Sequence, residues 1–260
     1  MNDNIAPRRL DENHIVQKSR PLLNAKDGEY TVNQLKLLDT YLACVNSHNP
    51  DNDVIAFSLN EYAGITDVDK IKFKDAERCL DLLGDIKVQI YDDVRYKTVM
   101  IPLFSKLATQ IDDKTGEWII YLKCNEEAKP YFFNIEEKTY VSYRLGNIIL
   151  MKSKHSIHLY QYLKDNAFRV KWETPLDVVK ELAFHVESDM YQKDFSKFRN
   201  KILDKAIEEV NLKTDIHVEY KAITSKGKVI AIEFTVTDRN KKRKPRVAKA
   251  NTKKITADKK

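Results

Sequence analysis

The stretch that decides the fold reads YQKDFSKFRNKILDKAIEEVN over residues 191–211, IHVEYKAI over 216–223, TSKGK over 224–228 and VIAIEFTV over 229–236. The first segment has helical periodicity, and the two strand-like segments flank a turn that contains glycine, which predicts a β-hairpin. A long amphipathic helix followed directly by a hairpin with lysines at its tip is typical of the DNA-facing half of a winged helix.

The segment 191–211 becomes amphipathic when its residues are placed about 100° apart around a helix axis. One face is apolar and is formed by Phe195, Phe198, Ile202, Ala206 and Val210. The opposite face carries Lys193, Lys197, Asn200, Lys201 and Asp204. Because the apolar face must pack on the domain core, the polar face can enter a major groove, where Asn and Lys reach base edges and phosphates.

Two features limit how this helix could contact DNA. Arg199 falls within the apolar stripe by angle, so it either extends past the helix start towards DNA or forms a structural ion pair, and both interpretations stay open. Beyond Asp204 the outward face turns acidic at Glu208 and Glu209. We therefore expect only the N-terminal half of the helix to approach a polyanion, as recognition helices commonly do.

A looser copy of the same order occurs earlier, in residues 68–124. There the segment 68–83 predicts a helix that ends at Gly84 and turns Lys74 and Arg78 outward, beside acidic residues. Mixed charge of this kind is as typical of a solvated helix face as of a DNA contact, so both interpretations remain open.

Each of the two units ends in a predicted hairpin with lysine at its tip. The sequence DDKTG at 112–116 predicts a turn that carries Lys114, and TSKGK predicts one in which Lys226 and Lys228 flank Gly227. Lysines at such tips are suited to phosphates, which position a protein on the duplex without reading sequence. We expect these three lysines to contact phosphate.

The pattern along the chain predicts an α+β protein with two tandem winged-helix domains and a disordered basic C-terminal tail. In the first unit, helices are expected at about 31–46 with Thr31 as N-cap, at 58–64 and at 68–83, before one long hairpin that includes the strand 96–111. In the second, SKHSIHLYQYLKDN predicts a helix, FRVKWE a strand, and Pro175 occupies the first position of a further helix.

These elements give expected limits for each part of the chain. The limits are 1–29 for an N-terminal extension, 30–133 for the first winged-helix domain (DNA contact), 134–152 for a connecting segment, 153–238 for the second winged-helix domain (main DNA recognition) and 239–260 for the tail.

The net charge of +6 is unevenly distributed along the 260 residues. From Arg239 to Lys260 there are 11 Lys or Arg and one acid, so the remainder of the chain is slightly acidic. Any DNA-binding surface of the folded body must therefore be local. No apolar run approaches the roughly 18 residues that span a bilayer, which favours a cytoplasmic protein without membrane contact.

The residues give little support for catalysis or for a cofactor. No phosphate-cradling glycine motif is present, and the chain has only 6 glycines. His155 and His158 could share a metal by their i, i+3 spacing, but no third ligand has persuasive spacing, so surface histidines and no metal site are expected. Cys44, Cys79 and Cys124 lie far apart in apolar segments, which predicts buried, reduced thiols.

Longer motifs resemble a known family, the iteron-binding plasmid replication initiators of the RepB/RepE-like group. The specific resemblance covers residues 153–237, where Ser153, Ser156, Ile157, Leu159, Tyr160 and Leu163 are followed by the basic helix from Phe198 to Asn211 and by Thr214-Asp215. A looser resemblance covers 15–133 through KSRPLLNA, YTVNQLKLLDTYL and SLNEYAGI.

The resemblance implies a sequence-specific binder of double-stranded DNA whose monomers bind tandem repeats, the iterons, at a plasmid origin with both winged helices on one DNA face. It implies a homodimer in equilibrium with the monomer, joined through the N-terminal domain, that binds an operator inverted repeat and represses its own gene. It also implies recruitment of a host initiator protein and the replicative helicase. The cluster Lys197, Arg199, Asn200 and Lys201 matches the base-reading helix of the family, with Asn200 where many members carry another basic residue.

Two other functions remain open. A plain winged-helix transcriptional regulator would share every feature except the origin. A nicking initiator enzyme would need a metal site of paired histidines and a nucleophilic tyrosine; the His-hydrophobic-His motif is absent, so tyrosines such as Tyr160 and Tyr162 are expected to pack or to contact phosphate. The prediction from the sequence is a DNA-binding initiator that is not an enzyme.

Overall fold

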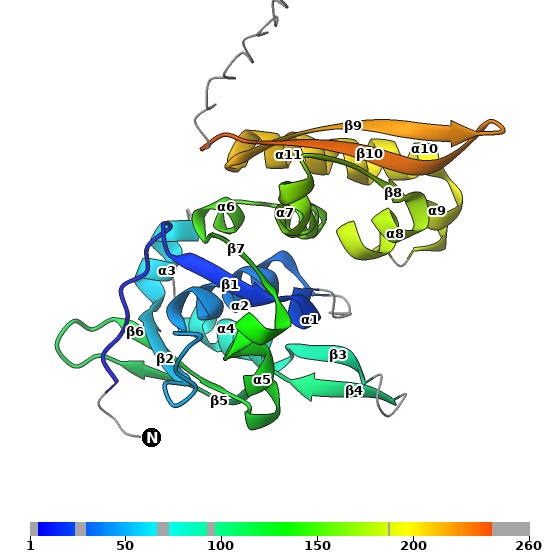
Figure 1. Cartoon of the computed structure of the whole chain (residues 1–260). Coiled ribbons are helices and arrows are strands. Elements are labelled where there is room, and N and C mark those ends of the chain that lie inside the picture. The colour runs from blue at the N-terminus through cyan, green and yellow to red at the C-terminus, as the bar shows by residue number, and fades with distance from the viewer. Residues whose placement is uncertain (1–4, 24–29, 67–72, 93–96, 187, 241–260) are drawn as a thin grey trace, which may run out of the picture.

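The computed structural model describes residues 5–23, 30–66, 73–92, 97–186 and 188–240. Two layers lie one above the other in Figure 1, an N-terminal body below and a C-terminal body above, and the chain passes from one to the other at β7 (Tyr140–Arg144), α6 (Gly146–Ile149) and α7 (Lys154–Asn166). The N-terminal body combines helices with three small antiparallel sheets and the C-terminal body combines helices with one, which confirms the predicted α+β class.

The N-terminal body contains the three expected helices: α2 (Val32–Cys44), α3 (Leu59–Thr66) and α4 (Phe73–Gly84). Thr31 caps α2 as expected, because its side chain accepts from the Gln34 backbone N–H while the Gln34 side chain accepts from the Thr31 backbone. The winged sheet has the order β2-β6-β5, formed by β2 (Val54–Ser58), β6 (Trp118–Cys124) and β5 (Phe104–Ile111).

The single long strand expected over 96–111 is wrong, because two strands occupy it. β4 (Lys97–Pro102) pairs with β3 (Lys87–Asp92) in a separate two-stranded sheet, and β5 turns away to pair with β6. Pro102 has no N–H to continue a ladder, and the next residue, Leu103, is fully buried and donates to Ile86 O at 3.0 Å. Burial of Leu103 thus fixes the point where the chain changes sheet.

A second two-stranded sheet joins segments that the sequence assigned to an extension and a connection. β1 (Ile15–Ser19) pairs antiparallel with β7, with Val16 opposite Tyr143, and α1 (Arg20–Leu23) follows β1. Val16, Leu22 and Tyr143 are all buried, so residues 15–23 are part of the core of the N-terminal body. The β1–β7 sheet contains strands from outside the expected limits of 30–133, and these domain limits stay a prediction.

The C-terminal body begins with α7 and closes with the sheet β8-β10-β9. Its elements are η3 (Ala167–Arg169), β8 (Lys171–Pro175), α8 (Leu176–Val178), η4 (Val179–Ala183), α9 (Asp189–Lys193), α10 (Phe195–Phe198), η5 (Arg199–Leu203), α11 (Asp204–Lys213), β9 (Ile216–Ser225) and β10 (Lys228–Asp238). Pro175 ends β8 with an extended ψ of 143°. It was expected at the first helical position, but it is the N-cap, and α8 begins at the next residue.

Short elements complete the N-terminal body between β6 and β7. They are η1 (Glu126–Ala128), α5 (Lys129–Phe132) and η2 (Ile135–Lys138). Ser19 Oγ donates to Tyr131 O at 2.8 Å, which ties α5 to β1. Phe132 and Phe133 are buried beneath them, so this segment belongs to the same core as α2.

Candidate nucleic-acid interface

The recognition helix of the C-terminal body begins at Asp194, three residues later than the predicted start. Asp194 has an extended backbone, and its carboxylate accepts from Lys197 N at 3.0 Å, so it breaks the chain between α9 and α10 and caps α10. This backbone hydrogen bond, together with nearby Lys197, lowers the pKa of Asp194. Lys193 consequently lies on α9 and not on the recognition helix, with Nζ 2.8 Å from Asp189 Oδ2.

The apolar stripe of this helix packs as the periodicity predicts. Phe198 is fully buried and meets Phe184 edge to face, with ring centroids 5.2 Å apart. Ile202, Leu203, Ala206 and Val210 are also buried. The helix is therefore fixed to the core along one side, and its other side is open to solvent.

A π-helical turn, η5, interrupts the recognition helix at Arg199–Leu203. Asp204 N donates to Arg199 O, five residues back, so this turn contains one more residue than an α-helical turn. Arg199, Asn200 and Lys201 are exposed while Ile202 and Leu203 are buried. Angles drawn on a regular helix placed Arg199 in the apolar stripe, whereas the structure leaves its side chain 48% exposed.

Arg199 has polar contacts with two neighbours on the same helix. Its Nε donates to Asn200 Oδ1 at 3.2 Å and lies 3.9 Å from Asp204 Oδ2, which is ion-pair range but too long for a hydrogen bond. The Lys197 ammonium lies 3.6 Å from Asp194 Oδ2 and is exposed, as is Lys201. The N-terminal half of the helix thus presents three exposed cations around Asn200.

The acidic second half of the helix is only partly as predicted. Glu208 is exposed, but Glu209 is half-buried and accepts from Lys152 N at 2.8 Å and Ser153 N at 3.2 Å. Glu209 therefore caps the start of α7 and does not face outward. Sequence periodicity could not show this, because its partners lie 56 and 57 residues away.

The second wing has the turn that its sequence predicts. Lys228 pairs with Ser225, and the two residues between them, Lys226 and Gly227, have φ values of 49° and 77°. Two central residues with positive φ define a type I′ turn, which favours glycine at the second of them. Lys226 and Lys228 are exposed at this tip.

The first body presents a weaker basic surface. Lys74 and Arg78 are exposed on α4, beside exposed Glu77 and Asp81, so the structure leaves both interpretations of this face open. In the wing tip, Asp112 Oδ1 accepts from Lys114 N at 2.8 Å and Thr115 N at 2.9 Å, and these bonds lower the pKa of Asp112. The turn leaves Lys114 exposed.

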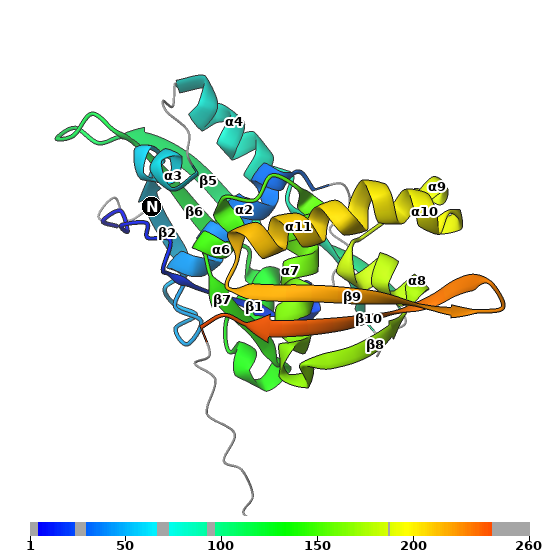
Figure 2. The same ribbon diagram turned by 90° about the horizontal axis from the view of Figure 1, so that it is seen from above.

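The two recognition helices lie on the same side of the molecule. In Figure 2, α4 and the continuous helix α10–η5–α11 both occupy the upper side, while the tips of β5–β6 and β9–β10 point to opposite ends. The two helices that were predicted from the sequence to contact DNA therefore lie on one side of the molecule. Such an arrangement can follow successive turns of a duplex.

Two structural residues around this helix carried no distinct sequence signal. The Asn211 side chain donates to Val218 O at 2.9 Å and accepts from Val218 N at 2.7 Å, which joins the end of α11 to β9. Arg239, assigned to the tail, donates to Asn211 O at 2.6 Å and Thr214 O at 3.2 Å. Arg239 therefore belongs to the folded body and satisfies carbonyls at the helix C-terminus. Residues 241–260, predicted to be disordered, lie outside the described residues.

His158 is buried and His155 is half-buried, so the prediction that both are surface histidines is wrong for His158. His158 is 5% exposed and stacks on His185 with ring centroids 4.0 Å apart, and His155 Nδ1 lies 2.9 Å from Phe184 O. Burial lowers the pKa of His155. Over the described ranges, no three His, Cys, Asp or Glu side chains are placed to hold a metal ion.

Tyr160 and two of the cysteines are likewise interior groups. Tyr160 is fully buried and donates to Asp215 Oδ1 at 2.9 Å, so it packs and does not contact phosphate. Cys44 and Cys124 are buried free thiols as predicted, and burial raises the pKa of each to about 12. The predicted burial of Cys79 falls on a side chain outside those described.

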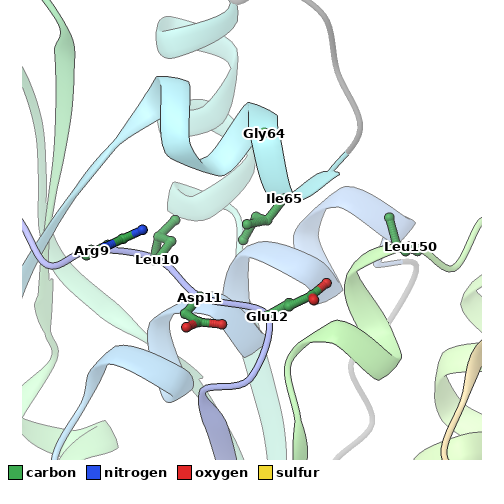
Figure 3. A pocket seen from close by; sticks show the side chains of 7 residues that line it. All are labelled: Arg9, Leu10, Asp11, Glu12, Gly64, Ile65 and Leu150. Carbon is green, nitrogen blue, oxygen red and sulfur yellow. The ribbon is translucent and has the colours of Figure 1, made fainter.

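One pocket lies away from the candidate interface, between the N-terminal segment, α3 and the residue that follows α6 (Figure 3). It has a volume of about 530 Å³ and is lined by Arg9, Leu10, Asp11, Glu12, Gly64, Ile65 and Leu150. Its charged groups are of both signs, and it includes none of the predicted DNA contacts. None of the helices in the described ranges has the length and apolar character needed to cross a membrane.

These features define a tandem winged-helix protein of the DNA-binding class. Its sequence matches the family "Initiator Replication protein, WH1" over residues 15–164 and "Initiator Rep protein, WH2" over residues 176–236. The chain belongs to this family of replication initiators.

The solved structure of another initiator agrees with this fold. The chain resembles the Pi initiator protein in complex with iteron DNA at a TM-score of 0.72 and 19% sequence identity, covering 89% of this chain and 100% of that chain. It also matches domains 2 and 3 of RctB at a TM-score of 0.46 and 14% identity, covering 91% of this chain and 95% of that chain. No curated protein sequence matches.

Proposed function

We propose that this protein initiates plasmid replication by sequence-specific binding to direct repeats, the iterons, in the double-stranded DNA of the origin. Membership of the initiator family is the observation that carries the proposal, and the Pi initiator, similar in fold, was solved with iteron DNA. The exposed cations of α10–η5, on the same side as α4, supply a surface of the required charge.

In this proposal the N-terminal half of the C-terminal recognition helix enters a major groove. Lys197, Arg199, Asn200 and Lys201 face base edges and adjacent phosphates, and Lys226 and Lys228 of the wing contact phosphate. On the first body, α4 presents Lys74 and Arg78 to the next groove, and Lys114 contacts phosphate. Lys193 forms an ion pair with Asp189 on α9, so it is the weakest candidate among the DNA-contacting residues predicted from the sequence.

Electrostatics predicts the salt dependence of this binding. If about six to ten phosphates are neutralised, the affinity falls roughly 10³- to 10⁵-fold between about 50 and 200 mM salt, because counterions are released from the duplex. The body outside the tail is slightly acidic, so this dependence would originate in the local cations named above and in the basic residues after Asn240.

The wider role follows the family expectation. A homodimer in equilibrium with the monomer would bind an operator inverted repeat and repress its own gene, and origin-bound monomers would recruit the host initiator protein and the replicative helicase. The protein would act in the cytoplasm, without cofactor and without enzymatic activity. Absence of strand cleavage and of a protein-linked DNA end after incubation of supercoiled plasmid with Mg²⁺ or Mn²⁺ would support the non-enzymatic role.

A footprint of the full chain on the DNA that flanks its own coding sequence tests the proposal. Protection of evenly spaced direct repeats is expected. Protection of a single inverted repeat alone would favour the second candidate, a winged-helix transcriptional regulator without origin function. Loss of all protection in the variant Lys197→Ala/Lys201→Ala, but not in Lys171→Ala on β8, would assign the footprint to the recognition helix.

A further inference from the structure

An acidic residue lies among the cations of the recognition helix and connects it to the wing. Asp204 Oδ1 accepts from Tyr220 Oη at 2.5 Å, and Asp204 Oδ2 lies 3.9 Å from Arg199 Nε. Tyr220 belongs to β9, the first strand of the wing, and Arg199 to η5. The two carboxylate oxygens therefore have different partners, one on each element.

Asp204 is an unfavourable residue for a DNA-facing helix, because its negative carboxylate would repel the phosphate backbone. Its side chain is 47% exposed, on the same helix as the exposed cations. Burial and the hydrogen bond to Asp204 raise the pKa of Tyr220, so the phenol stays protonated and remains a donor to this carboxylate. Asp204 is thereby held in place from the sheet side.

The contacts of Arg199 leave part of its guanidinium available. Its Nε is directed at Asn200 Oδ1, at 3.2 Å, and at Asp204. Within the described part of the chain, no residue accepts a hydrogen bond from its Nη1 or Nη2. Two adjacent amino groups at the end of a guanidinium match the O6 and N7 acceptors of guanine in the major groove.

Asn200, in contrast to Arg199, has one of its base-reading groups already occupied. Bidentate reading of adenine would need its amide oxygen to accept from N6 while its amide nitrogen donates to N7. That oxygen already accepts from Arg199 Nε. The geometry therefore favours Asn200 as a partner that orients Arg199 over Asn200 as an independent reader of a base.

We propose that Asp204 and Tyr220 are positioning residues that hold the Arg199 guanidinium for end-on recognition of one guanine. Asn200 acts with them by accepting from the same Nε group. This inference rests on the proposed function, because it requires the helix to enter a major groove. Asp204 and Tyr220 would thus contribute to base specificity without contacting a base.

The test uses the full chain and the duplex that its own footprint protects, prepared also with each guanine in turn replaced by 7-deazaguanine, which lacks the N7 acceptor. The wild-type chain is expected to lose affinity about tenfold at one guanine, within the range of a bidentate arginine contact. Arg199→Ala is expected to bind the normal and modified duplexes equally at that position, because the contact is already gone.

The positioning role predicts a specific coupling. Asp204→Asn and Tyr220→Phe should each reduce the penalty at the same guanine, and should change nothing further in the Arg199→Ala background. Glu208→Gln is the matched control, because it removes a nearby exposed carboxylate that has no contact with Arg199; it should raise affinity for all duplexes and leave the guanine penalty intact. Thermal unfolding of each variant verifies that it is folded.

Three results would overturn the inference. A uniform loss of affinity in Asp204→Asn that adds to that of Arg199→Ala would indicate a structural role for Asp204. An unchanged guanine penalty in both Asp204→Asn and Tyr220→Phe would remove the positioning role while leaving DNA binding intact. Absence of any sequence preference in the wild-type chain would overturn the proposed function itself.

Discussion

Gln161 Nε2 donates a hydrogen bond to Asp39 Oδ2 at 3.0 Å, although the two residues are 122 positions apart. Gln161 belongs to α7 and Asp39 to α2, so this bond joins the two layers of Figure 1. Tyr143 Oη donates to the same oxygen at 3.0 Å, and Lys18 Nζ lies 3.6 Å from the other one. All four side chains are buried, which makes this cluster a polar centre between the bodies.

Removal of the carboxylate should be strongly destabilising. Asp39→Ala leaves the Lys18 ammonium buried without a counterion, and breaking a buried pair in this way costs about 3–5 kcal/mol. The free energy of unfolding, measured in urea, checks this value. Lys18→Met combined with Asp39→Asn removes both charges and should recover much of the loss, because an apolar chain replaces the buried ammonium. An additive double variant would show that the pair is not coupled.

The same carboxyl has a definite pH signature. Burial raises the pKa of Asp39 above its ordinary value of 3.8, against the opposing effects of Lys18, Tyr143 and Gln161. The folded state therefore binds its proton more tightly than the unfolded state, and this group alone makes the protein more stable as pH falls towards 3.8. The free energy of unfolding of Asp39→Asn should lack this increase at low pH. Equilibrium denaturation of both proteins at several pH values measures the difference.

Asn211 offers a test of the joint between recognition helix and wing. Asn211→Ala removes both hydrogen bonds to Val218 and leaves a strand N–H and C=O without these partners, which should cost about 1–3 kcal/mol. The adjacent Leu212 is 77% exposed, so Leu212→Ala is the matched control and should change stability by less than about 0.5 kcal/mol. Equal effects of the two variants in chemical denaturation would contradict the role assigned to Asn211.

Local sequence signals predicted the elements whose stabilising contacts are local. Thr31 and Gln34 form a capping box within one helical turn, and Lys226-Gly227 forms a type I′ turn between strands that pair directly. The apolar stripe from Phe198 to Val210 packs as its spacing indicates, because a helix of this period has only one face to bury. The same reasoning located the exposed Lys197 and Lys201 of the candidate interface.

Contacts between distant residues account for what the sequence did not predict. β1 pairs with β7 across more than 100 residues, and Glu209 caps α7 from α11; neither has a periodic signal. The break at Asp194 was missed because α9 and α10 together continue one helical pattern. The π turn at η5 changes which residues are exposed after Phe198, so angles drawn for a regular helix misplaced Arg199.

Half-buried His155 should make stability depend on pH near neutrality. Burial lowers the pKa of His155 below its ordinary value of 6.5, against the opposing contact with Phe184 O. The unfolded state therefore takes up the proton first, so this group causes stability to fall as pH decreases from 6.5 towards the folded-state pKa. His155→Gln should flatten the dependence of Tm on pH over this interval. The same slope in His155→Gln and in the wild-type chain would assign the effect to other groups.

The wing lysines should contribute affinity without sequence preference. If Lys226 and Lys114 each contact a phosphate, alanine at either position should weaken all duplexes about equally and reduce the slope of log affinity against log salt by about one. Fluorescence anisotropy with a protected repeat and a scrambled duplex, over a range of salt concentrations, measures both quantities. Lys171→Ala is the control, because Lys171 is exposed on β8 and paired with Glu233 at 3.0 Å; its slope should equal that of the wild-type chain. An unchanged slope in Lys226→Ala would place the tip of the second wing away from the duplex. Loss of the preference for the protected repeat over the scrambled duplex in Lys226→Ala would instead indicate that Lys226 contacts bases.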